Sequence, residues 1–360
     1  MTALEWYVTA GKIGLVIGLL MTVAPIMNWV ERRGAAIIQN RVGPNRIGPF
    51  GIFQAIPDAI KFLFKEDSIP GHVNGFYYFI APIIVLIPAC MTFAVIPFGD
   101  PITIMGQTFK MQTADLNVGF LYIFAMASLG VYGLIIGGWA SNNKFALLGS
   151  MRSSSQMISY ELSLGLSVIG LVMVFSTVEL GPMVQKQADV MWQLGPIAIP
   201  RWGIFIQPLG CLIFVIASFA EANRLPFDLP EGEPEIVGFH VEYGSMKFAT
   251  FMMGEYMNMA VASGLIATLY FGGYQMLPGM GTLLDSLQLS PAAYMWSKLA
   301  LQNISLAFKV GLFMWLFVWV RWTVPRFRYD QLMDLGWKML FPLALLNVFI
   351  TAVMIYLGWV

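Results

Sequence analysis

Long apolar runs separated by shorter polar segments follow one another along the whole chain. A helix needs about 20 apolar residues to cross the hydrocarbon core of a bilayer, and runs close to that length recur throughout. The pattern therefore predicts an all-α polytopic membrane protein, folded as a single membrane domain over residues 1–360. The eight expected transmembrane helices cover residues 12–30, 76–97, 117–140, 157–178, 203–222, 248–272, 299–322 and 337–358.

Composition agrees with this class of protein. Hydrophobic residues make up 58% of the chain and charged residues 11%, against about 25% charged residues in a typical soluble domain. The formal net charge is zero, so nucleic-acid binding has no electrostatic basis here. The first apolar run is too long for a signal peptide and is followed directly by Glu31, Arg32 and Arg33, so we interpret it as a retained span.

The chain has too few thiols for a redox centre of its own. Its two cysteines, Cys90 and Cys211, lie far apart inside apolar runs, as do small packing residues. A zinc or iron–sulfur site needs clustered ligands. We therefore expect no metal site and no catalytic residue in this chain, and any electron carrier must come from another subunit.

Basic residues are distributed unevenly over the connections. The positive-inside rule places the basic connections on the cytoplasmic or matrix side. Fourteen of the 20 Lys and Arg residues follow spans 1, 3, 5 and 7. Both termini are therefore expected on the outer side, and the loops 31–75 and 223–247 on the inner side. The outer connections hold only Lys12, Lys110, Lys186, Arg201 and Lys298.

The first inner loop combines turn residues with one amphipathic segment. Its sequence NRVGPNRIGPFG is too rich in glycine and proline for a regular helix. In the next segment Ile52, Ile56, Ile60 and Leu63 recur at helical spacing, with polar residues opposite. This predicts an amphipathic helix in the interface plane. It is either a surface anchor or the roof of a cavity that opens into the membrane.

Carboxylates gather around the third inner loop. They are interleaved with Leu225, Phe227, Leu229 and Ile236, which is not the pattern of a solvated acidic run. We expect this loop to fold against protein or to line a wet cavity. The six carboxylates are Glu221, Asp228, Glu231, Glu233, Glu235 and Glu242.

Glutamates and one lysine within or at the end of the predicted spans are candidates for function. Glu161 lies one turn into span 4 and Glu255 about two turns into span 6, whereas Glu221 ends span 5 and Lys309 lies near the middle of span 7. Such groups usually face protein or water and mark ion or proton pathways. Glu161 has the alternative role of a helix N-terminal cap, and Glu221 that of an interfacial residue.

Several stretches together resemble one known family. They include ERRGAAIIQNRVGPNRIGPFG, SYELSLGL, AEANRLPFDLPEGEPE, VEYGSMKFATFMMGEY and RWTVPRFRYDQLM. The chain is similar, over about residues 25–345, to the H-type membrane subunit of respiratory complex I. This proton-pumping NADH:quinone oxidoreductase has a mitochondrial counterpart in which the equivalent chain is called subunit 1. The likeness departs from the family at EIVGFHVEY, which is one residue shorter between Glu235 and Glu242.

The resemblance implies a role at the junction of the hydrophilic and membrane arms. Quinone would be the substrate, whereas NADH, FMN and the iron–sulfur clusters would belong to partner subunits. Those partners are the hydrophilic subunits at the quinone site, small membrane subunits and antiporter-like subunits, all in a bacterial cell membrane or a mitochondrial inner membrane. The quinone chamber would involve Arg32, Gln39, Arg41, Asp58, Glu66, Arg224 and Phe227. The proton path would involve Glu161, Glu221, Glu231, Glu233, Glu235, Glu242, Glu255 and Lys309.

Three other readings are compatible with the pattern. One is the equivalent membrane subunit of a membrane-bound hydrogenase or formate-linked complex. Another is a stand-alone cation transporter that uses Glu161, Glu255 and Lys309. The third is a scaffold that only anchors a soluble arm, for which neutral substitutions at the buried acids would be silent.

Overall fold

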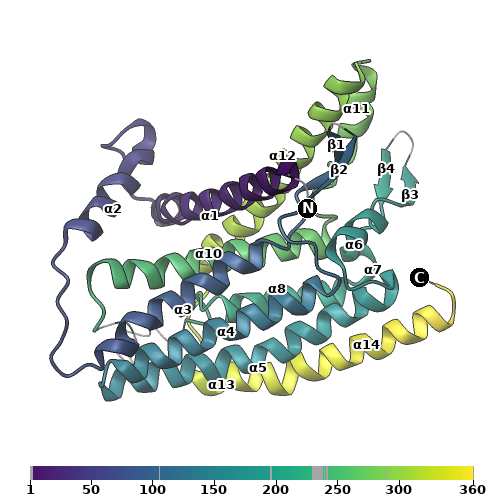
Figure 1. Ribbon diagram of the computed structural model, residues 1–360. Coiled ribbons are helices and arrows are strands. Elements are labelled where there is room, and N and C mark those ends of the chain that lie inside the picture. Colours follow the sequence, from purple (N-terminus) through teal and green to yellow (C-terminus); the bar gives the residue numbers. More distant parts are fainter. Residues whose placement is uncertain are drawn as a thin grey trace.

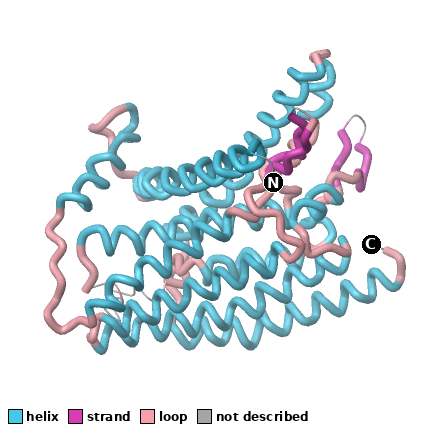
Figure 2. The backbone as a smooth tube through the Cα atoms, in the orientation of Figure 1, coloured by secondary structure: helices cyan, strands magenta, loops and turns pink. Residues whose placement is uncertain are grey.

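A computed structural model shows a bundle of long helices with two short β-hairpins at one end (Figures 1 and 2). It describes residues 3–104, 106–194, 197–228, 238, 240, 242–288 and 290–359. Six helices among these residues are long and apolar enough to cross a membrane, so the chain is a multi-pass membrane protein. They cover Glu5–Ile38, Gly75–Phe93, Gly119–Ala140, Lys144–Phe175, Pro291–Thr323 and Tyr329–Tyr356.

The long elements alternate in direction along the bundle (Figure 1). They are α1 (Ala3–Ile38), α3 (Gly75–Phe93), α4 (Gly119–Ala140), α5 (Lys144–Phe175), α8 (Pro208–Glu221), α10 (Ser245–Tyr270), α12 (Pro291–Thr323) and α14 (Phe341–Tyr356). Short helices connect or extend them: α2 (Ala55–Phe64), α6 (Leu180–Lys186), α7 (Gly203–Ile206), α11 (Met280–Ser286) and α13 (Tyr329–Asp334), which a π-helical turn (Leu335–Leu340) joins to α14.

The two ends of the bundle differ in structure. One end, which we call the hairpin face, carries α11 and the antiparallel pairs β1 (Gly99–Ile104) with β2 (Gln107–Met111) and β3 (Val190–Leu194) with β4 (Ile197–Pro200). The other end, the loop face, carries α2 and the described parts of the connections 39–74 and 222–244. The first and last described residues both lie toward the hairpin face (Figure 1).

Two of the predicted spans are not among the six long apolar helices. The expected span 203–222 corresponds to α7 and α8. The two helices are separated by Gln207, whose backbone is non-helical, and α8 begins at Pro208. The expected span 248–272 corresponds to α10, which carries Lys247 and Glu255. A count of eight transmembrane helices therefore stays a prediction.

Helix α5 begins thirteen residues before the predicted start of span 4. Its N-cap is Asn143, whose side-chain oxygen accepts the backbone N–H of Phe145 at 2.9 Å. The serine-rich first turns are accommodated within the helix, since several hydroxyls find an acceptor among the backbone carbonyls of the preceding turn, as Ser155 does with Met151 at 2.8 Å. Glu161 is consequently in mid-helix, and its suggested role as an N-terminal cap was wrong.

Small residues let α4 and α10 approach α3 closely. A Cβ added at Gly133 would lie 2.5 Å from Cγ2 of Val85, and one added at Gly254 would lie 2.7 Å from Cγ1 of the same side chain. Val85 of α3 is thus wedged between two glycines from different helices. This is the small-residue packing by which membrane helices associate without a hydrophobic driving force.

The predicted irregular loop and the helix after it are both present. Gly51 has a φ of 74°, and a Cβ there would lie 2.4 Å from the carbonyl oxygen of Pro44, so the turn requires glycine. The backbone then enters α2, in which no residue is buried. Ile56, Ile60 and Leu63 of α2 are exposed in this chain. The position of α2 relative to a bilayer remains a prediction.

Candidate functional site

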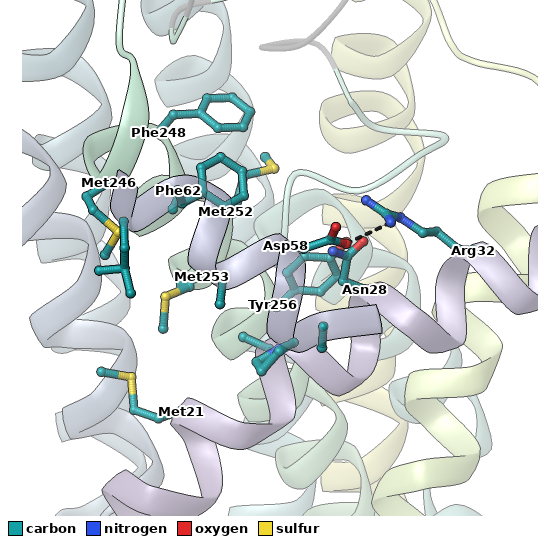
Figure 3. Close-up of a pocket in the computed structure, with 16 residues that line it drawn as sticks. Met21, Asn28, Arg32, Asp58, Phe62, Met246, Phe248, Met252, Met253 and Tyr256 are labelled. Carbon is teal, nitrogen blue, oxygen red and sulfur yellow. Dashed lines mark hydrogen bonds and ion pairs between the residues drawn. The ribbon is translucent and has the colours of Figure 1, made fainter. Parts of the chain in front are cut away.

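A large apolar cavity lies between α1, α2 and α10 near the loop face (Figure 3). Its volume is about 390 Å³. Met21 comes from α1, Phe62 from α2, and Met246, Met252 and Met253 from the first turns of α10. Flexible thioethers and aromatic rings adapt to an irregular apolar ligand. The cavity therefore suits a hydrophobic molecule of drug-like size.

One end of this cavity is polar. The guanidinium of Arg32 donates to Asp58 Oδ2 at 2.8 Å, the contact dashed in Figure 3, and Gln54 donates to Asp58 Oδ1 at 3.2 Å. Asp58 lies in the first turn of α2, where the helix dipole favours a carboxylate. Asn28 and Tyr256 complete the polar end. An apolar body with one polar tip would fit this distribution of side chains.

A second cavity of about 250 Å³ adjoins the first. Asn28, Arg32, Met252 and Tyr256 line both, so the two spaces share a wall. The second cavity is much more polar, because its other lining residues include Glu31, Arg41, Arg224 and Arg321. A molecule in the apolar cavity would therefore have its polar end next to charged groups.

A buried charge cluster forms the floor of this second cavity. Arg224 lies 3.7 Å from Glu31 Oε2 and 3.7 Å from Glu255 Oε2, and its guanidinium stacks 4.3 Å from the ring centroid of Tyr256. Tyr256 donates to Glu31 Oε2 at 2.8 Å, and Arg321 pairs with Glu31 Oε1. Exposure is 8% for Glu31, 5% for Arg224 and 7% for Glu255. Two acids and two arginines thus balance here, and only Arg321, whose side chain is 24% exposed, reaches toward solvent.

Such a cluster is costly unless every charge has a partner. Each buried ion costs several kcal/mol of desolvation, which the pairing must offset. A hydrophobic replacement would often be at least as stable, so stability alone is a poor reason for the cluster. Charges held in low dielectric respond strongly to any change of charge beside them.

A small cavity lies inside the bundle, one helical turn along α10 from the charge cluster. Asn258 lies one turn beyond Glu255 on α10 and lines this cavity together with Glu221. Its volume is about 40 Å³, and a bound water needs roughly 10–15 Å³ of such space. Glu221 interacts electrostatically with Glu161, which accepts a hydrogen bond from Ser128 of α4. We call Glu255, Glu221 and Glu161 the acidic series: Asn258 lies one turn from Glu255 and shares a cavity with Glu221, which in turn interacts with Glu161.

The structure brings only some of the predicted chamber residues together. Arg32 and Asp58 line the apolar cavity, and Arg32, Arg41 and Arg224 line the polar one. Gln39 does not line either cavity but accepts a hydrogen bond from Arg41 at 2.6 Å. Glu66 is exposed just beyond α2. Phe227 is buried away from both spaces and packs on Tyr160 and Phe327, with ring centroids 5.5 and 5.6 Å away.

The remaining predicted proton-path residues lie elsewhere. Glu242 is held near the loop face by Asn143, which donates at 2.9 Å, with His72 at 3.7 Å. Lys309 belongs to the opposite half of the molecule, where it donates to two backbone carbonyls. Glu231, Glu233 and Glu235 lie outside the described residues.

Sequence reasoning missed Glu31, Tyr256 and Arg321 as members of the site. Glu31 was noted only as the residue that follows the first apolar run, but α1 continues to Ile38, so the carboxylate sits within a helix. An ionisable group inside a long apolar helix is itself a signal of function. Tyr256 directly follows Glu255 and carried no separate signal.

Comparison with known proteins identifies the family. The model of the NADH dehydrogenase family matches residues 11–352. The chain belongs to this family. Membership in the NADH dehydrogenase family makes this chain a subunit of an oxidoreductase, as the resemblance predicted. Among its relatives is the NADH-quinone oxidoreductase H 1 subunit of Cytophaga hutchinsonii, 47% identical over 94% of this chain and 93% of the relative.

Other NADH dehydrogenase relatives match over nearly their full length. The NADH-quinone oxidoreductase H subunit of Bdellovibrio bacteriovorus is 46% identical over 98% of this chain and 97% of its own. The corresponding H 2 subunit of Geobacter sulfurreducens is 45% identical over 99% and 98%. These relatives are bacterial, and each is named as a subunit of an NADH-quinone oxidoreductase.

Proposed function

We propose that this chain is the H-type membrane subunit of a proton-translocating NADH:quinone oxidoreductase and that its two adjoining cavities receive the quinone. The observation that carries the proposal is the union of a methionine-rich apolar space with a polar, charged one. A quinone has this same division, because its tail is apolar and its head carries two carbonyl oxygens. The apolar cavity would hold the tail, and Arg32, Asp58, Arg41 and Arg224 would surround the path of the head.

Electrons would reach the quinone from an iron–sulfur cluster of a hydrophilic partner subunit docked on the loop face. NADH and FMN would likewise belong to partners, and further membrane subunits would pack beside the bundle. Reduction of one quinone takes two electrons and two protons and forms two O–H bonds. The protons have to come from nearby groups or water, and the buried charge cluster places ionisable side chains beside the polar cavity.

Coupling would follow from the low dielectric around Arg224. A change of charge on the quinone head would alter the balance between Glu31, Glu255 and the two arginines. A proton drawn from Glu255 would be replaced along the series through Glu221 and Glu161, with water in the small cavity beside Asn258. Carboxylates that share a site hold their protons jointly, which favours transfer between them.

Eight transmembrane helices and an inner loop face are part of this proposal. The segment from α7 to α8 runs from residue 203 to 221 and α10 has 26 residues, and a membrane-crossing segment needs roughly 17–25. The basic residues of the connections assign the loop face to the cytoplasm and both termini to the outer side. Loops 31–75 and 223–247 would then form the quinone-side surface.

A substitution that fills the apolar cavity tests the proposal. Ala59 lines the cavity, whereas its neighbour Ile60 is exposed and does not line it. Overfilling a packed site costs about 1–3 kcal/mol, which corresponds to roughly 5- to 150-fold in affinity. Ala59→Phe should raise the KM for quinone by a factor in this range in the intact oxidoreductase, and Ile60→Phe should not.

The kinetic pattern separates this explanation from simple misfolding. A loss of assembly would lower the amount of intact oxidoreductase in the membrane and hence the maximal rate of quinone reduction, whereas a filled cavity would raise the KM for quinone in complexes that remain intact. Equal KM values for the two variants, with both complexes intact, would refute the placement of the quinone between α1, α2 and α10.

A further inference from the structure

The hairpin face contains a second large polar cavity, far from the quinone site proposed above. Its volume is about 340 Å³. Asp100 of β1, Tyr274 and Gln275 of the α10–α11 connection, and Lys298 and Gln302 of α12 line it. One water needs roughly 10–15 Å³ of such space, so the cavity has room for a chain of waters.

The cavity lies against a polar stripe on α12. Lys298, Gln302, Ser305 and Lys309 follow one another at intervals of four, three and four residues, which places them on one face of the helix. Eleven residues span about 16 Å along a helix axis. Exposure falls from the partly exposed Lys298 to 4% for Gln302, 1% for Ser305 and 5% for Lys309. The stripe thus leads from the cavity into the bundle.

Each member of the stripe has a polar partner on the cavity side. Lys298 and Gln302 both contact Asp100 Oδ2 at 2.7 Å. Ser305 and Lys309, the two innermost members, both donate at 2.8 Å to the backbone carbonyl of Gln275, a residue that also lines the cavity. Lys309 also donates to the carbonyl of Gly273 at 2.9 Å and lies 4.9 Å from the ring centroid of Trp202.

The stripe ends at Lys309. One and two turns further along α12, Phe313 and Phe317 are buried and packed on Phe271 and Phe219, with ring centroids 4.9 and 4.0 Å away. Arg321, the nearest member of the buried charge cluster on α12, is twelve residues or about 18 Å from Lys309. An aromatic layer therefore separates Lys309 from the charge cluster.

Ionisable side chains beside the stripe are Asp100 and Tyr274 and, next to Lys298, Tyr294 with its partner Asp285. Burial alone would raise the pKa of Asp100, but hydrogen bonds from Lys298 and Gln302 outweigh it and hold that pKa below its usual value. Tyr274 also hydrogen-bonds Asp100. Lys186 of α6 lies in the same half of the molecule but donates to the carbonyl of Phe175 instead. A carboxylate thus stays charged at the mouth of the cavity.

We propose that the Asp100 cavity and the α12 stripe form an aqueous access path through which Lys309 exchanges protons with the solution on the hairpin face. Lys309 is the terminal site of this path rather than a member of the acidic series near the loop face. The inference rests on the proposed function for identifying that solution as the outer one and for the proton yield measured below, whereas the labelling experiment is independent of it. A purely structural lysine, which clamps the α10–α11 connection to α12, is the competing account.

Thiol labelling tests the path without any measurement of turnover. Ser305→Cys and Phe313→Cys would be placed in a chain whose own cysteines carry Cys90→Ala and Cys211→Ala. Native membranes containing the whole oxidoreductase are exposed to a membrane-impermeant cationic methanethiosulfonate from one face at a time, and this chain is analysed by mass spectrometry. Ser305→Cys should label from the hairpin face and not from the loop face, whereas Phe313→Cys should label from neither.

Charge-retaining substitution then tests the proton. Arg keeps the charge and the hydrogen-bond donors of a lysine but does not release a proton near neutral pH. Lys309→Arg and Lys309→Met should therefore both lower proton translocation per electron in assembled complexes. No labelling of Ser305→Cys from the hairpin face, or a normal proton yield in Lys309→Arg, would overturn the proposal. Failure of the Ala59→Phe experiment would leave both of these results unaffected.

Discussion

Arg224 is the residue on which the buried charge cluster depends most. It lies between two acids, 3.7 Å from each, and Tyr256 covers one face of its guanidinium. In Arg224→Met the side chain keeps much of its length but loses its charge. Glu31 retains Arg321 and Tyr256 as partners, whereas Glu255 loses the ion pair described above. Breaking a buried ion pair from one side costs about 3–5 kcal/mol, since it leaves the other charge buried.

Two measurements on the assembled oxidoreductase check this magnitude. Arg224→Met should lower the midpoint of thermal inactivation and slow NADH oxidation by quinone, whereas oxidation by a water-soluble acceptor, counted per assembled complex, should stay normal. Arg224→Lys is the matched control, because an ammonium keeps the charge but cannot fork between two carboxylates. It should fall between Arg224→Met and the native protein.

The ordering of these variants is what the cluster geometry requires. If Arg224→Met assembled, withstood heat and reduced quinone like the native protein, the two acids would not depend on Arg224, and the electrostatic argument would fail. If Arg224→Lys were as defective as Arg224→Met, the charge itself would matter less than the shape of the guanidinium and its stacking on Tyr256.

Three further outcomes are expected. Glu161→Gln should lower the rate of quinone-linked proton translocation, whereas Glu5→Gln, in the first turn of α1 near the hairpin face, should not. Acidification of proteoliposomes that contain the oxidoreductase measures both rates. Asp100 has a pKa below its usual value in the folded protein, so its charged form stabilises the fold above pH ~4. This stabilisation is lost as the pH falls through the folded pKa. The difference in thermal inactivation temperature between native and Asp100→Asn complexes should therefore shrink in acid. Gly133→Ala should destabilise the α3–α4 contact by about 1–3 kcal/mol, and adding Val85→Ala should restore part of that loss in a double-mutant cycle, whereas strictly additive effects would contradict the contact.

Local patterns predicted the parts of the fold that depend on local physics. Apolar runs located the long helices because each has to satisfy its backbone within the bilayer. They misplaced the start of α5, since Ser150, Ser154 and Ser155 look like a loop in sequence but bond carbonyls of their own helix. Hydropathy reports whether a side chain prefers lipid or water. It does not report where the backbone hydrogen bonds of a helix begin or end.

The site was less accessible to sequence reasoning because its contacts are distant along the chain. Tyr256 and Glu31 are 225 residues apart, yet they share a hydrogen bond. The resemblance to the complex I membrane subunit supplied Arg32, Asp58 and Arg224, which do line the cavities. It grouped Lys309 with the acids, whereas the lysine's partners are carbonyls of the segment after α10. That segment has no signature in the sequence that would reveal where it folds back.

The placement of the two chain ends has a practical consequence. Both lie toward the hairpin face, opposite the cavities of the loop face (Figure 1). If the loop face receives the soluble arm as proposed, an affinity tag fused to either end would emerge on the opposite side of the bilayer. Such a tag should allow purification of the oxidoreductase without loss of quinone reduction.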